Sequence, residues 1–439
     1  MSEQSASESL AIAVVKQLRG HGHKVYLVGG CVRDRLLRTR PKDFDIATDA
    51  SPSQLANYFP GAQLVGAHFG VVLVRDGVAQ VEVATFRSDG AYSDGRRPDQ
   101  VRFESEPSLD AQRRDFTINA LMEDPISGEI LDYVGGRADL TSKTVRAIGD
   151  ATRRFEEDHL RMLRAVRFAA RLGFTIEEKT RQAITQRAKF VRTVSAERVR
   201  DELARILTEG GASRGIQLLD ELGLLALLLP EVKAFQRVEQ PPEFHPEGDV
   251  WTHVLLMLEK MGSASSSLAL GVLLHDVGKP RTFRRADRIR FDGHAEVGAE
   301  MATEILQRFR FSKDEVEHVT ALVANHMKFK DVQKMRPSTL KRFLRLAHFE
   351  EHLELHRLDC LASNGRSESY EFVKEKLSEL SSEALRPERL ISGRDLIAAG
   401  YSPGPEFAAA LEAVETAQLE GEIQTRAEAL AVARRVLDR

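Results

Sequence analysis

The sequence predicts an α+β protein, in which a small sheet with helices occupies the N-terminal third and helices alone make up the rest. Three observations lead to this prediction. Short apolar segments at residues 25–28 and 71–86 have the length and alternation of strands. Asp76-Gly77 divides the second segment, and this dipeptide is a strong hairpin signal. From residue 151 onward the apolar residues recur at helical spacing instead.

Size and composition place the chain among ordinary globular proteins. Its 439 residues suffice for about three domains, and 42% hydrophobic and 29% charged residues exclude a wholly disordered chain. No apolar run approaches the roughly 18 residues of a membrane helix. A polar N-terminus and only two cysteines predict a reducing, cytoplasmic location. Because the net charge is −3, any nucleic-acid contact must come from a local basic patch.

The most informative segment spans residues 26–48, YLVGGCVRDRLLRTRPKDFDIAT. A strand leads into Gly29 and Gly30, which lack a Cβ and let the backbone approach an anion, and the N-terminus of the basic helix that follows favours phosphate. A second strand is predicted to present Asp43 and Asp45 on one face. Either feature alone would usually be a turn or two solvated acids. Together they indicate a site for Mg²⁺ that carries a nucleoside triphosphate.

With this arrangement the segment resembles the head of the polymerase-β-type nucleotidyltransferases, in the class II branch of bacterial tRNA CCA-adding enzymes and bacterial poly(A) polymerases. The resemblance implies four domains along the chain. They are a polymerase-β-like head with a small mixed sheet at residues 1–150, a helical neck with a nucleotide-template helix and an RNA-binding surface at 151–235, an HD metal phosphohydrolase domain at 236–385, and a helical tail at 386–439.

The resemblance also assigns side chains in the head. A polymerase-type site needs a third carboxylate, and the family pattern V-E-V-x-T-F-R puts it at Glu82, which alone would be a solvent-facing acid on an edge strand. In RRDFTINA the plain alternative is a helix capped by Asp115. The family pattern assigns this segment to sugar and triphosphate, because the arginine fork suits phosphate and because Asp115 and Asn119 would share one helix face.

The neck is expected to contain one helix over residues 155–174. Taken alone, Glu157 and Arg161 form an i,i+4 ion pair. The family pattern E-D-x-x-R implies another role, in which Asp158 accepts a hydrogen bond from the amino group of cytosine or adenine and Arg161 donates to the ring nitrogen. Uracil and guanine would present groups of the wrong polarity, at a cost of about 1–3 kcal/mol for each desolvated mismatch.

Together these assignments define an expected site. Asp43, Asp45 and Glu82 are the expected catalytic residues, with Mg²⁺ held by the first two. The expected nucleotide-binding residues are Gly29, Gly30, Arg33, Arg113, Arg114, Asp115, Asn119, Glu157, Asp158, Arg161, Arg164 and Arg167.

The neck carries the strongest local charge. Residues 151–200 contain thirteen Lys and Arg against six acids, an excess of +7. This excess predicts a phosphate-tracking surface for the acceptor stem of a tRNA, although a solvated charged helix is the alternative. The resemblance implies the tRNA 3′ end, CTP and ATP as partners, and we expect no membrane contact and a possible homodimer.

From residue 243 the pattern changes to histidines and acids among apolar helices. The pair His275-Asp276 at the end of an apolar helix is the signature of an HD-type metal phosphohydrolase domain, although a lone histidine on an apolar face is usually a core residue. The resemblance to that family implies metal ligands at His253, His275, Asp276, His294, His326 and Asp359. Imidazole and carboxylate suit Mn²⁺, Ni²⁺ or Mg²⁺, and Lys279 is expected to bind a phosphate oxygen.

A second histidine series has helical spacing. His348, His352 and His356 recur at i, i+4 and i+8, which could bind a metal. We expect them to form a surface face instead, because the six ligands of the HD pattern already suffice.

The resemblance leaves several functions open. The Gly- and Ser-rich loop at 88–100 corresponds to a loop that CCA-adding and A-adding enzymes need for the terminal A, so it argues against a CC-only enzyme. The segment 64–74 lacks the R-F-R-L-x-H-V pattern of bacterial poly(A) polymerases. An A-adding enzyme stays possible. In a different class, the HD domain would be the main activity and the head would only hold RNA.

Overall fold

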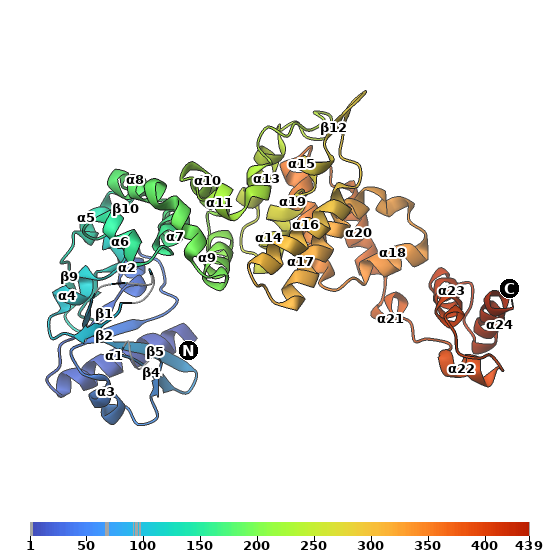
Figure 1. Cartoon of the computed structure of the whole chain (residues 1–439). Coiled ribbons are helices and arrows are strands. Elements are labelled where there is room, and N and C mark those ends of the chain that lie inside the picture. Colours follow the sequence, from blue (N-terminus) through green and yellow to red (C-terminus); the bar gives the residue numbers. More distant parts are fainter. Residues whose placement is uncertain (1–2, 66–69, 91, 93–94, 96–97, 439) are drawn as a thin grey trace. The chain divides into compact units, whose positions relative to one another are not determined.

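The computed structural model describes residues 3–65, 70–90, 92, 95 and 98–438. The chain divides into two compact units, Met1–Lys233 and Ala234–Arg439 (Figure 1). The first unit contains a mixed sheet with helices, and the second is almost entirely helical, so the α+β prediction is confirmed. No described helix has both the length and the apolar character that a membrane span requires.

A seven-stranded sheet organises the N-terminal part of the first unit. Its strands lie in the order β3-β4-β5-β2-β1-β8-β9. Their bounds are β1 Val25–Val28, β2 Asp45–Thr48, β3 Gln63–Leu64, β4 Val71–Asp76, β5 Ala79–Thr85, β8 Met122–Glu123 and β9 Ile130–Leu131. β2 and β5 run parallel and the other neighbouring strands antiparallel, which makes the sheet mixed, as expected.

Helices and a second ribbon complete this part. The helices are α1 Glu3–Gly20, α2 Gly30–Leu36, α3 Pro52–Tyr58, α4 Pro107–Gln112, α5 Gly136–Thr141 and the 3₁₀ turn η2 Thr117–Asn119. β6 (Arg87–Asp89) and β7 (Val101–Phe103) pair antiparallel, so the first two residues of the loop predicted at 88–100 belong to a strand instead. Residues 91, 93–94 and 96–97 of that loop, and residues 66–69 of the segment compared with poly(A) polymerases, lie outside the described residues.

The hairpin prediction is confirmed. β4 and β5 pair through Asp76 and Ala79, so the connection is the two-residue turn Gly77-Val78, with Gly77 at φ +58°. This positive φ is a conformation that glycine adopts without steric strain. β5 lies between β4 and β2, so Glu82 is on an inner strand and not on an edge, but its side chain is exposed, as the plain alternative expects.

The predicted strand that carries both aspartates is shorter than expected. β2 begins at Asp45, and Asp43 lies just before the strand on an exposed segment. Phe44 between them is buried, with 3% of its surface exposed, as its apolar side chain requires. Asp45 pairs with Val28 on one side and with Glu82 on the other, so the register places two of the three predicted carboxylates opposite each other.

The rest of the first unit is helical. Its elements are α6 Ala151–Glu157, α7 Arg161–Leu172, α8 Glu178–Arg187, η3 Ala188–Thr193, α9 Ala196–Thr208, α10 Ala212–Glu221, α11 Leu225–Leu228 and α12 Pro230–Lys233, with the short parallel pair β10 Thr144–Val145 and β11 Thr175–Ile176.

The prediction of one helix over 155–174 is wrong. The backbone is extended at Asp158, with φ −151° and ψ 105°. The Asp158 carboxylate accepts a hydrogen bond from the backbone N–H of Leu160 at 3.1 Å, a local bond that competes with the helix.

The second unit contains the helices around the paired His275-Asp276, and its elements are α13 Val250–Lys260, α14 Ser266–Leu274, α15 Lys279–Thr282, β12 Arg284–Arg285, β13 Ile289–Arg290, α16 His294–Arg308, α17 Lys313–Asn325, η4 His326–Lys334, α18 Pro337–Leu344, α19 Phe349–Ala362, α20 Glu368–Glu379, α21 Ser382–Leu385, α22 Gly393–Ala398, α23 Glu406–Glu420 and α24 Arg426–Leu437. The apolar α14 is buried among α13, α17 and α19. α22, α23 and α24 form a small core of their own around Leu396, Ala410 and Ala429.

Candidate active sites

A cavity of about 510 Å³ in the first unit gathers most of the residues predicted for the head. Of the predicted set it is lined by Gly29, Gly30, Arg33, Asp43, Asp45, Arg113, Arg114, Asp115, Asn119, Asp158, Arg161, Arg164 and Arg167. Glu82 and Glu157 are not part of this lining. The glycine turn, the segment just before β2, and helix α7 lie far apart in the sequence. Residues from all three therefore meet in one polar cavity.

The glycine turn allows two charged groups to approach the backbone. Gly29 precedes α2 and has φ +77°. A Cβ at this position would lie 3.4 Å from Nη1 of Arg114 and 3.7 Å from Oδ2 of Asp45. These are ordinary contact distances, so a larger residue would be strained chiefly by the positive φ.

The three predicted carboxylates interact electrostatically. Burial raises the pKa of Asp45, and so do the charges of Glu82 and Asp43, whereas Arg114 lowers it; the result is a pKa of about 6. Carboxylates that repel one another in this way fit a hard divalent cation, because a bound cation would offset their repulsion and carboxylate oxygens are its preferred ligands.

Arg113 and Arg114 are fixed by an acid that the sequence reasoning missed. Asp110 is fully buried and accepts hydrogen bonds from Nε of Arg113 at 2.8 Å and from Nη2 of Arg114 at 2.9 Å. Burial alone would raise the pKa of Asp110, but the two guanidinium groups hold it below its usual value. The i,i+3 and i,i+4 spacing of Asp110 from these arginines is a signal that could have identified it.

Asp115 and Asn119 do not share a helix face, because the chain is extended at Phe116 and only a single 3₁₀ turn follows. They still meet, since Nδ2 of Asn119 donates to Oδ1 of Asp115 at 3.2 Å. Arg33 donates to Oδ1 of Asn119 at 2.6 Å, and Nε of Arg164 donates to Oδ2 of Asp115 at 2.7 Å. Burial opposes ionisation of Asp115, but Arg164 outweighs it and lowers its pKa to about 2.

The predicted base-reading pair is held by two separate partners. Arg198 of α9 donates two hydrogen bonds to the Asp158 carboxylate, at 2.7 and 3.1 Å. Glu157 accepts from Nη1 of Arg161 at 2.7 Å, so the ion pair expected from spacing alone does form. Glu157 therefore fixes Arg161 without lining the cavity. Arg198 was missed because forty residues separate it from Asp158, and no local pattern links them.

Part of the basic excess of the neck lines this cavity. Arg167 is buried and pairs with Glu202 at 2.8 Å and Glu209 at 3.0 Å, and Arg171 pairs with Asp34 at 3.1 Å. The exposed cations of the segment are Arg153, Lys179, Lys189 and Arg192. Four of its thirteen basic residues therefore line the cavity and four others are exposed.

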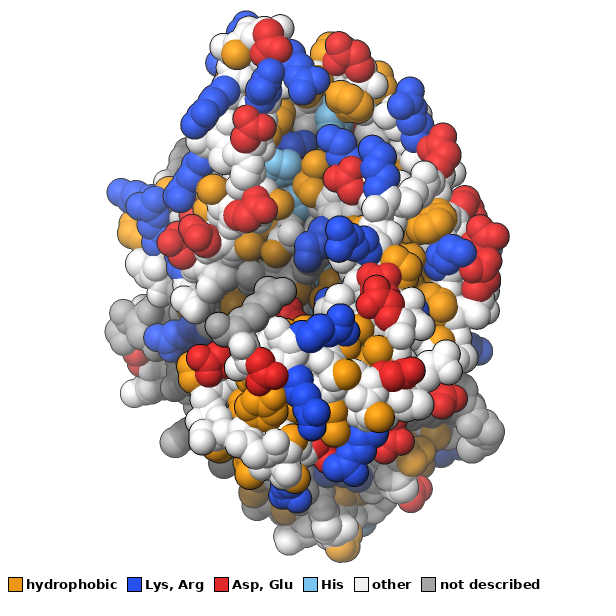
Figure 2. Space-filling view, turned by 90° about the vertical axis from the view of Figure 1, so that its right-hand side faces the viewer, with side chains coloured by type: hydrophobic (Ala, Val, Ile, Leu, Met, Phe, Trp, Pro, Cys, Tyr) orange, Lys and Arg blue, Asp and Glu red, His pale blue; other side chains and the backbone are white. Residues whose placement is uncertain are grey.

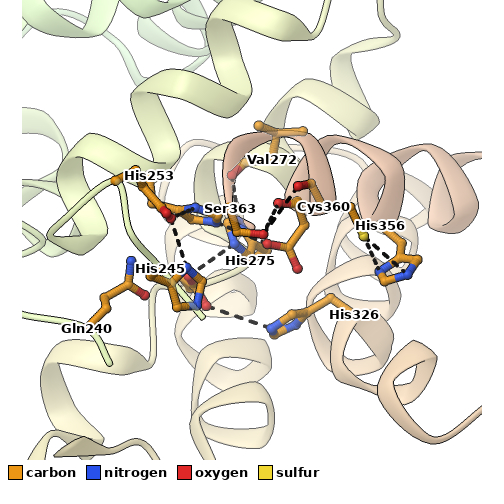
Figure 3. Close-up of polar contacts among 12 residues, drawn as sticks. Gln240, His245, His253, Val272, His275, His326, His356, Cys360 and Ser363 are labelled. Carbon is orange, nitrogen blue, oxygen red and sulfur yellow. Dashed lines mark hydrogen bonds and ion pairs between the residues drawn. The ribbon is translucent and has the colours of Figure 1, made fainter. Parts of the chain in front are cut away.

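In the second unit, the six predicted HD ligands fall into two groups, each with its ligand atoms within 4.8 Å of one another. The groups are His253, His275 and Asp359, and Asp276, His294 and His326. Nε2 of His275 lies 3.1 Å from Oδ2 of Asp276, which links them. In the close-up, His253 and His275 lie side by side and His326 points toward them, whereas His356 lies apart beside Cys360 (Figure 3).

The hydrogen bonds of these histidines fit metal binding. Nδ1 of His275, His294 and His326 lies 2.9, 2.8 and 2.6 Å from the backbone oxygen of Val272, Phe291 and Val323, respectively. Each Nδ1 therefore carries the proton, and each Nε2 is free to bind a cation. Nε2 of His294 and Nε2 of His326 lie 3.2 Å apart, which brings two lone pairs together. Burial and His275 lower the pKa of His326 to about 3, so it is neutral, as a ligand must be.

His253 has a different supporting partner, which the sequence reasoning missed. Its Nδ1 lies 2.6 Å from Oε1 of Glu247, and its Nε2 lies 3.2 Å from Oδ1 of Asp359. Glu247 also contacts Nδ1 of His245 at 2.9 Å. A carboxylate behind a histidine orients the ring and increases its basicity.

Lys279, which is predicted to bind a phosphate oxygen, lies beside the candidate metal ligand Asp276. It is buried, its Nζ lies 2.7 Å from Oδ2 of Asp276, and it donates to Oε1 of Gln240 at 2.6 Å.

The prediction of a surface face for the second histidine series is wrong. His348 is exposed, but His352 has only 1% of its surface exposed and His356 stacks on Phe329 with 4.3 Å between ring centroids. α19 packs against α13, α14 and α17, so positions four residues apart turn into the core. None of the three belongs to a metal-ligand group among the residues that the structure describes.

Comparisons with known proteins agree with this architecture. The sequence patterns that match are the poly A polymerase head domain at residues 25–146, the "Probable RNA and SrmB- binding site of polymerase A" at 173–236 and the HD domain at 249–348. A CCA-adding enzyme from Oceanobacillus iheyensis is 44% identical over 214 residues, which cover 49% of this chain and 53% of that protein. The chain spans about half the length of the curated relatives it matches.

Solved structures resemble nearly the whole chain. The Bacillus stearothermophilus CCA-adding enzyme in complex with CTP has a TM-score of 0.76 at 27% identity and covers 99% of this chain and 98% of its own. A Thermotoga maritima CCA-adding enzyme complexed with tRNA has a TM-score of 0.58 at 21% identity, covers 98% of this chain and 94% of its own, and shows the same fold. The chain therefore combines a poly A polymerase head domain, a region that matches an RNA-binding site of polymerase A and an HD domain, and it is similar to CCA-adding enzymes in fold over nearly its whole length.

Proposed function

We propose that this protein adds C, C and A to the 3′ end of tRNA, with CTP and ATP as substrates and pyrophosphate as product. The observation that carries the proposal is the single cavity in which a glycine turn, two of the three carboxylates, a set of arginines and the pair Asp158–Arg161 meet. Such an enzyme would work in the cytoplasm. We assign the head to residues 1–150, the neck to 151–235, the HD domain to 236–385 and the tail to 386–439.

In the proposed reaction the RNA 3′-hydroxyl attacks the α-phosphorus of the nucleotide. A phosphodiester bond forms, the bond to pyrophosphate breaks, and the hydroxyl proton is released. Asp43 and Asp45 would hold Mg²⁺, which neutralises the triphosphate charge and activates the hydroxyl. Glu82 accepts a hydrogen bond from the hydroxyl and polarises it. The glycine turn and the arginines of the cavity hold the triphosphate through backbone N–H groups and guanidinium forks.

Nucleotide choice is assigned to Asp158 and Arg161. The carboxylate accepts from the exocyclic amino group that cytosine and adenine share, and the guanidinium donates to the neighbouring ring nitrogen. Uracil would point an oxygen at the carboxylate. Because both protein groups are held by their own ion pairs, neither can turn away to avoid a mismatch.

Product length tests this function. The protein is incubated with tRNA that lacks its last three nucleotides, with CTP and ATP singly and together. We expect two additions with CTP alone, three with both, and none with ATP alone. Extension only of tRNA that ends in CC would identify an A-adding enzyme, and long A tails would identify a poly(A) polymerase. No extension at all would refute the proposal.

We further propose that the HD domain is a metal-dependent phosphohydrolase that repairs damaged tRNA 3′ ends before nucleotide addition. Its two groups of ligands, five of them buried and Asp359 half-buried, favour this second activity. On a 2′,3′-cyclic phosphate, water adds to phosphorus, one P–O bond to the ribose breaks, and the leaving oxygen takes a proton. His253, His275, Asp276, His294, His326 and Asp359 would hold a divalent cation such as Mn²⁺, Ni²⁺ or Mg²⁺, which activates the water. Lys279 binds a phosphate oxygen.

Replacement of the paired His275-Asp276 by alanines separates the two activities. We expect hydrolysis of 2′,3′-cyclic and 3′-phosphates to be lost while nucleotide addition is retained. A wild-type protein that never cleaves such phosphates with Mn²⁺, Ni²⁺ or Mg²⁺ would refute the hydrolase. Hydrolysis without any nucleotide addition would instead make the HD domain the main activity.

A further inference from the structure

A short basic hairpin connects two residues of the HD centre. β12 and β13 pair antiparallel, and the hairpin joins α15, which begins at Lys279, to α16, which begins at His294 (Figure 1). Both of its ends are therefore fixed at the proposed reaction centre, one at the phosphate-binding lysine and the other at a metal ligand.

The hairpin is strongly basic and exposed. Residues 281–290 have a net charge of +4, from five arginines and one aspartate. The arginines, all exposed, are Arg281, Arg284, Arg285, Arg288 and Arg290. Two of them pair with acids, Arg290 with Asp287 and Arg285 with Glu239. Arg281, Arg284 and Arg288 form no ion pair with any residue that the structure describes. Three guanidinium groups are thus available to phosphate.

Aromatic rings accompany these charges. Phe283 is 38% exposed, and its ring centroid lies 5.9 Å from that of Phe291. Nζ of Lys279 lies 5.3 Å from the centroid of Phe291, whose backbone oxygen accepts the hydrogen bond of His294. In the space-filling view, Lys and Arg side chains gather at the top of the molecule, above a hollow in which histidine side chains are visible (Figure 2).

We propose that this hairpin binds the single-stranded 3′-terminal segment of an RNA and directs its terminal phosphate to Lys279 and the HD metal ligands. Basic side chains that follow the backbone, beside exposed rings on which bases stack, are the means by which proteins hold single-stranded nucleic acid without reading its sequence. A free mononucleotide needs only the centre itself, whereas successive phosphates of a chain would use the arginines. This inference rests on the hydrolase proposed above and names its substrate as an RNA end.

Charge reversal in the full-length protein tests the inference. The variant Arg281→Glu/Arg284→Glu/Arg288→Glu leaves the predicted metal ligands and Lys279 intact. The control Lys313→Glu/Lys334→Glu/Lys374→Glu reverses three exposed lysines on α17, η4 and α20. Hydrolysis is measured on 2′,3′-cyclic AMP and on a 12-nucleotide single-stranded RNA that ends in a 2′,3′-cyclic phosphate. We expect the hairpin variant to lose at least tenfold in kcat/KM on the RNA, to stay within twofold on the mononucleotide, and to have a weaker salt dependence. The control should resemble the wild type on both.

A second measurement does not depend on hydrolysis. RNA with a 3′-terminal 4-thiouridine is photocrosslinked to the wild-type protein, and we expect crosslinked peptides from residues 279–294. Crosslinks there without any hydrolysis would refute the hydrolase and keep the RNA-binding role. If the hairpin variant hydrolysed both the RNA and the mononucleotide as fast as the wild type, the inference would be overturned and the hydrolase would stand. The absence of such crosslinks would have the same consequence. A reversal that changes only the sedimentation of the protein would make the hairpin a contact between copies of the chain, and would also overturn it.

Discussion

Replacement of Arg198 by alanine should weaken the choice of nucleotide more than the chemistry. The Arg198 guanidinium holds the Asp158 carboxylate by two hydrogen bonds, with 23% and 15% of the two side chains exposed. Without it, the carboxylate can rotate away from a mismatched base. One contact that discriminates between bases contributes about 1–3 kcal/mol, which corresponds to roughly 5- to 150-fold in rate at about 1.4 kcal/mol for each factor of ten.

We therefore expect Arg198→Ala to lower the ratio of kcat/KM for CTP over UTP by about tenfold to a hundredfold. The assay is single-nucleotide addition to tRNA that lacks CCA. Arg198→Lys should recover only part of the ratio, because an ammonium group does not reproduce the planar fork. Arg200→Ala is the matched control two residues along α9, where the guanidinium pairs with the exposed Asp201. If Asp158→Ala relaxed the choice and Arg198→Ala did not, the proposed positioning of Asp158 would be refuted.

Three further predictions concern other parts of the chain. Gly29→Ala should raise KM for CTP and ATP at least tenfold, because strain at its φ of +77° would shift the turn that lines the cavity. Gly61→Ala carries a similar strain at φ +90° but lies outside the cavity lining, so it should change only stability. Asp115→Asn should lower the free energy of unfolding at neutral pH by about 2–3 kcal/mol, since the pKa of Asp115 in the folded protein is about 2. This stabilisation is present above about pH 4 and is lost as the pH falls toward 2. The melting temperatures of variant and wild type should therefore converge in acid, and a constant difference would contradict the prediction. Removal of divalent cations by a chelator should lower the melting temperature of the second unit, because a cation at a hundredfold excess over its Kd stabilises the folded state by about 2.7 kcal/mol. His326→Ala should abolish the shift in melting temperature seen on adding Mn²⁺ or Ni²⁺ and leave nucleotide addition unchanged. An undiminished shift would place the cation elsewhere.

The sequence predicts those features whose cause is local. The hairpin at β4 and β5 follows from Asp76-Gly77 and alternating apolar residues, and the helix at Pro52–Tyr58 follows from Ser51, which forms a capping box with Gln54. The glycine turn, the two aspartates and the paired His275-Asp276 are likewise recognised from short patterns.

Features that depend on distant residues were not predicted. The helix break at Asp158 has a local hydrogen bond to Leu160, but the residue that holds the carboxylate is Arg198, on another helix. Glu247 supports His253 through a loop that precedes α13, and nothing in the spacing of histidines reveals it. His352 belongs to the core because α19 packs on several helices at once, and a helical period alone does not show which face is covered.

The division of the chain after residue 233 bears on how its two candidate centres can change over time. The described residues of each candidate centre come from one unit only, the first from positions up to Glu209 and the second from His245 onward. A substitution in one candidate centre therefore removes no residue of the other. Either centre could change during evolution while the residues of the other stay intact.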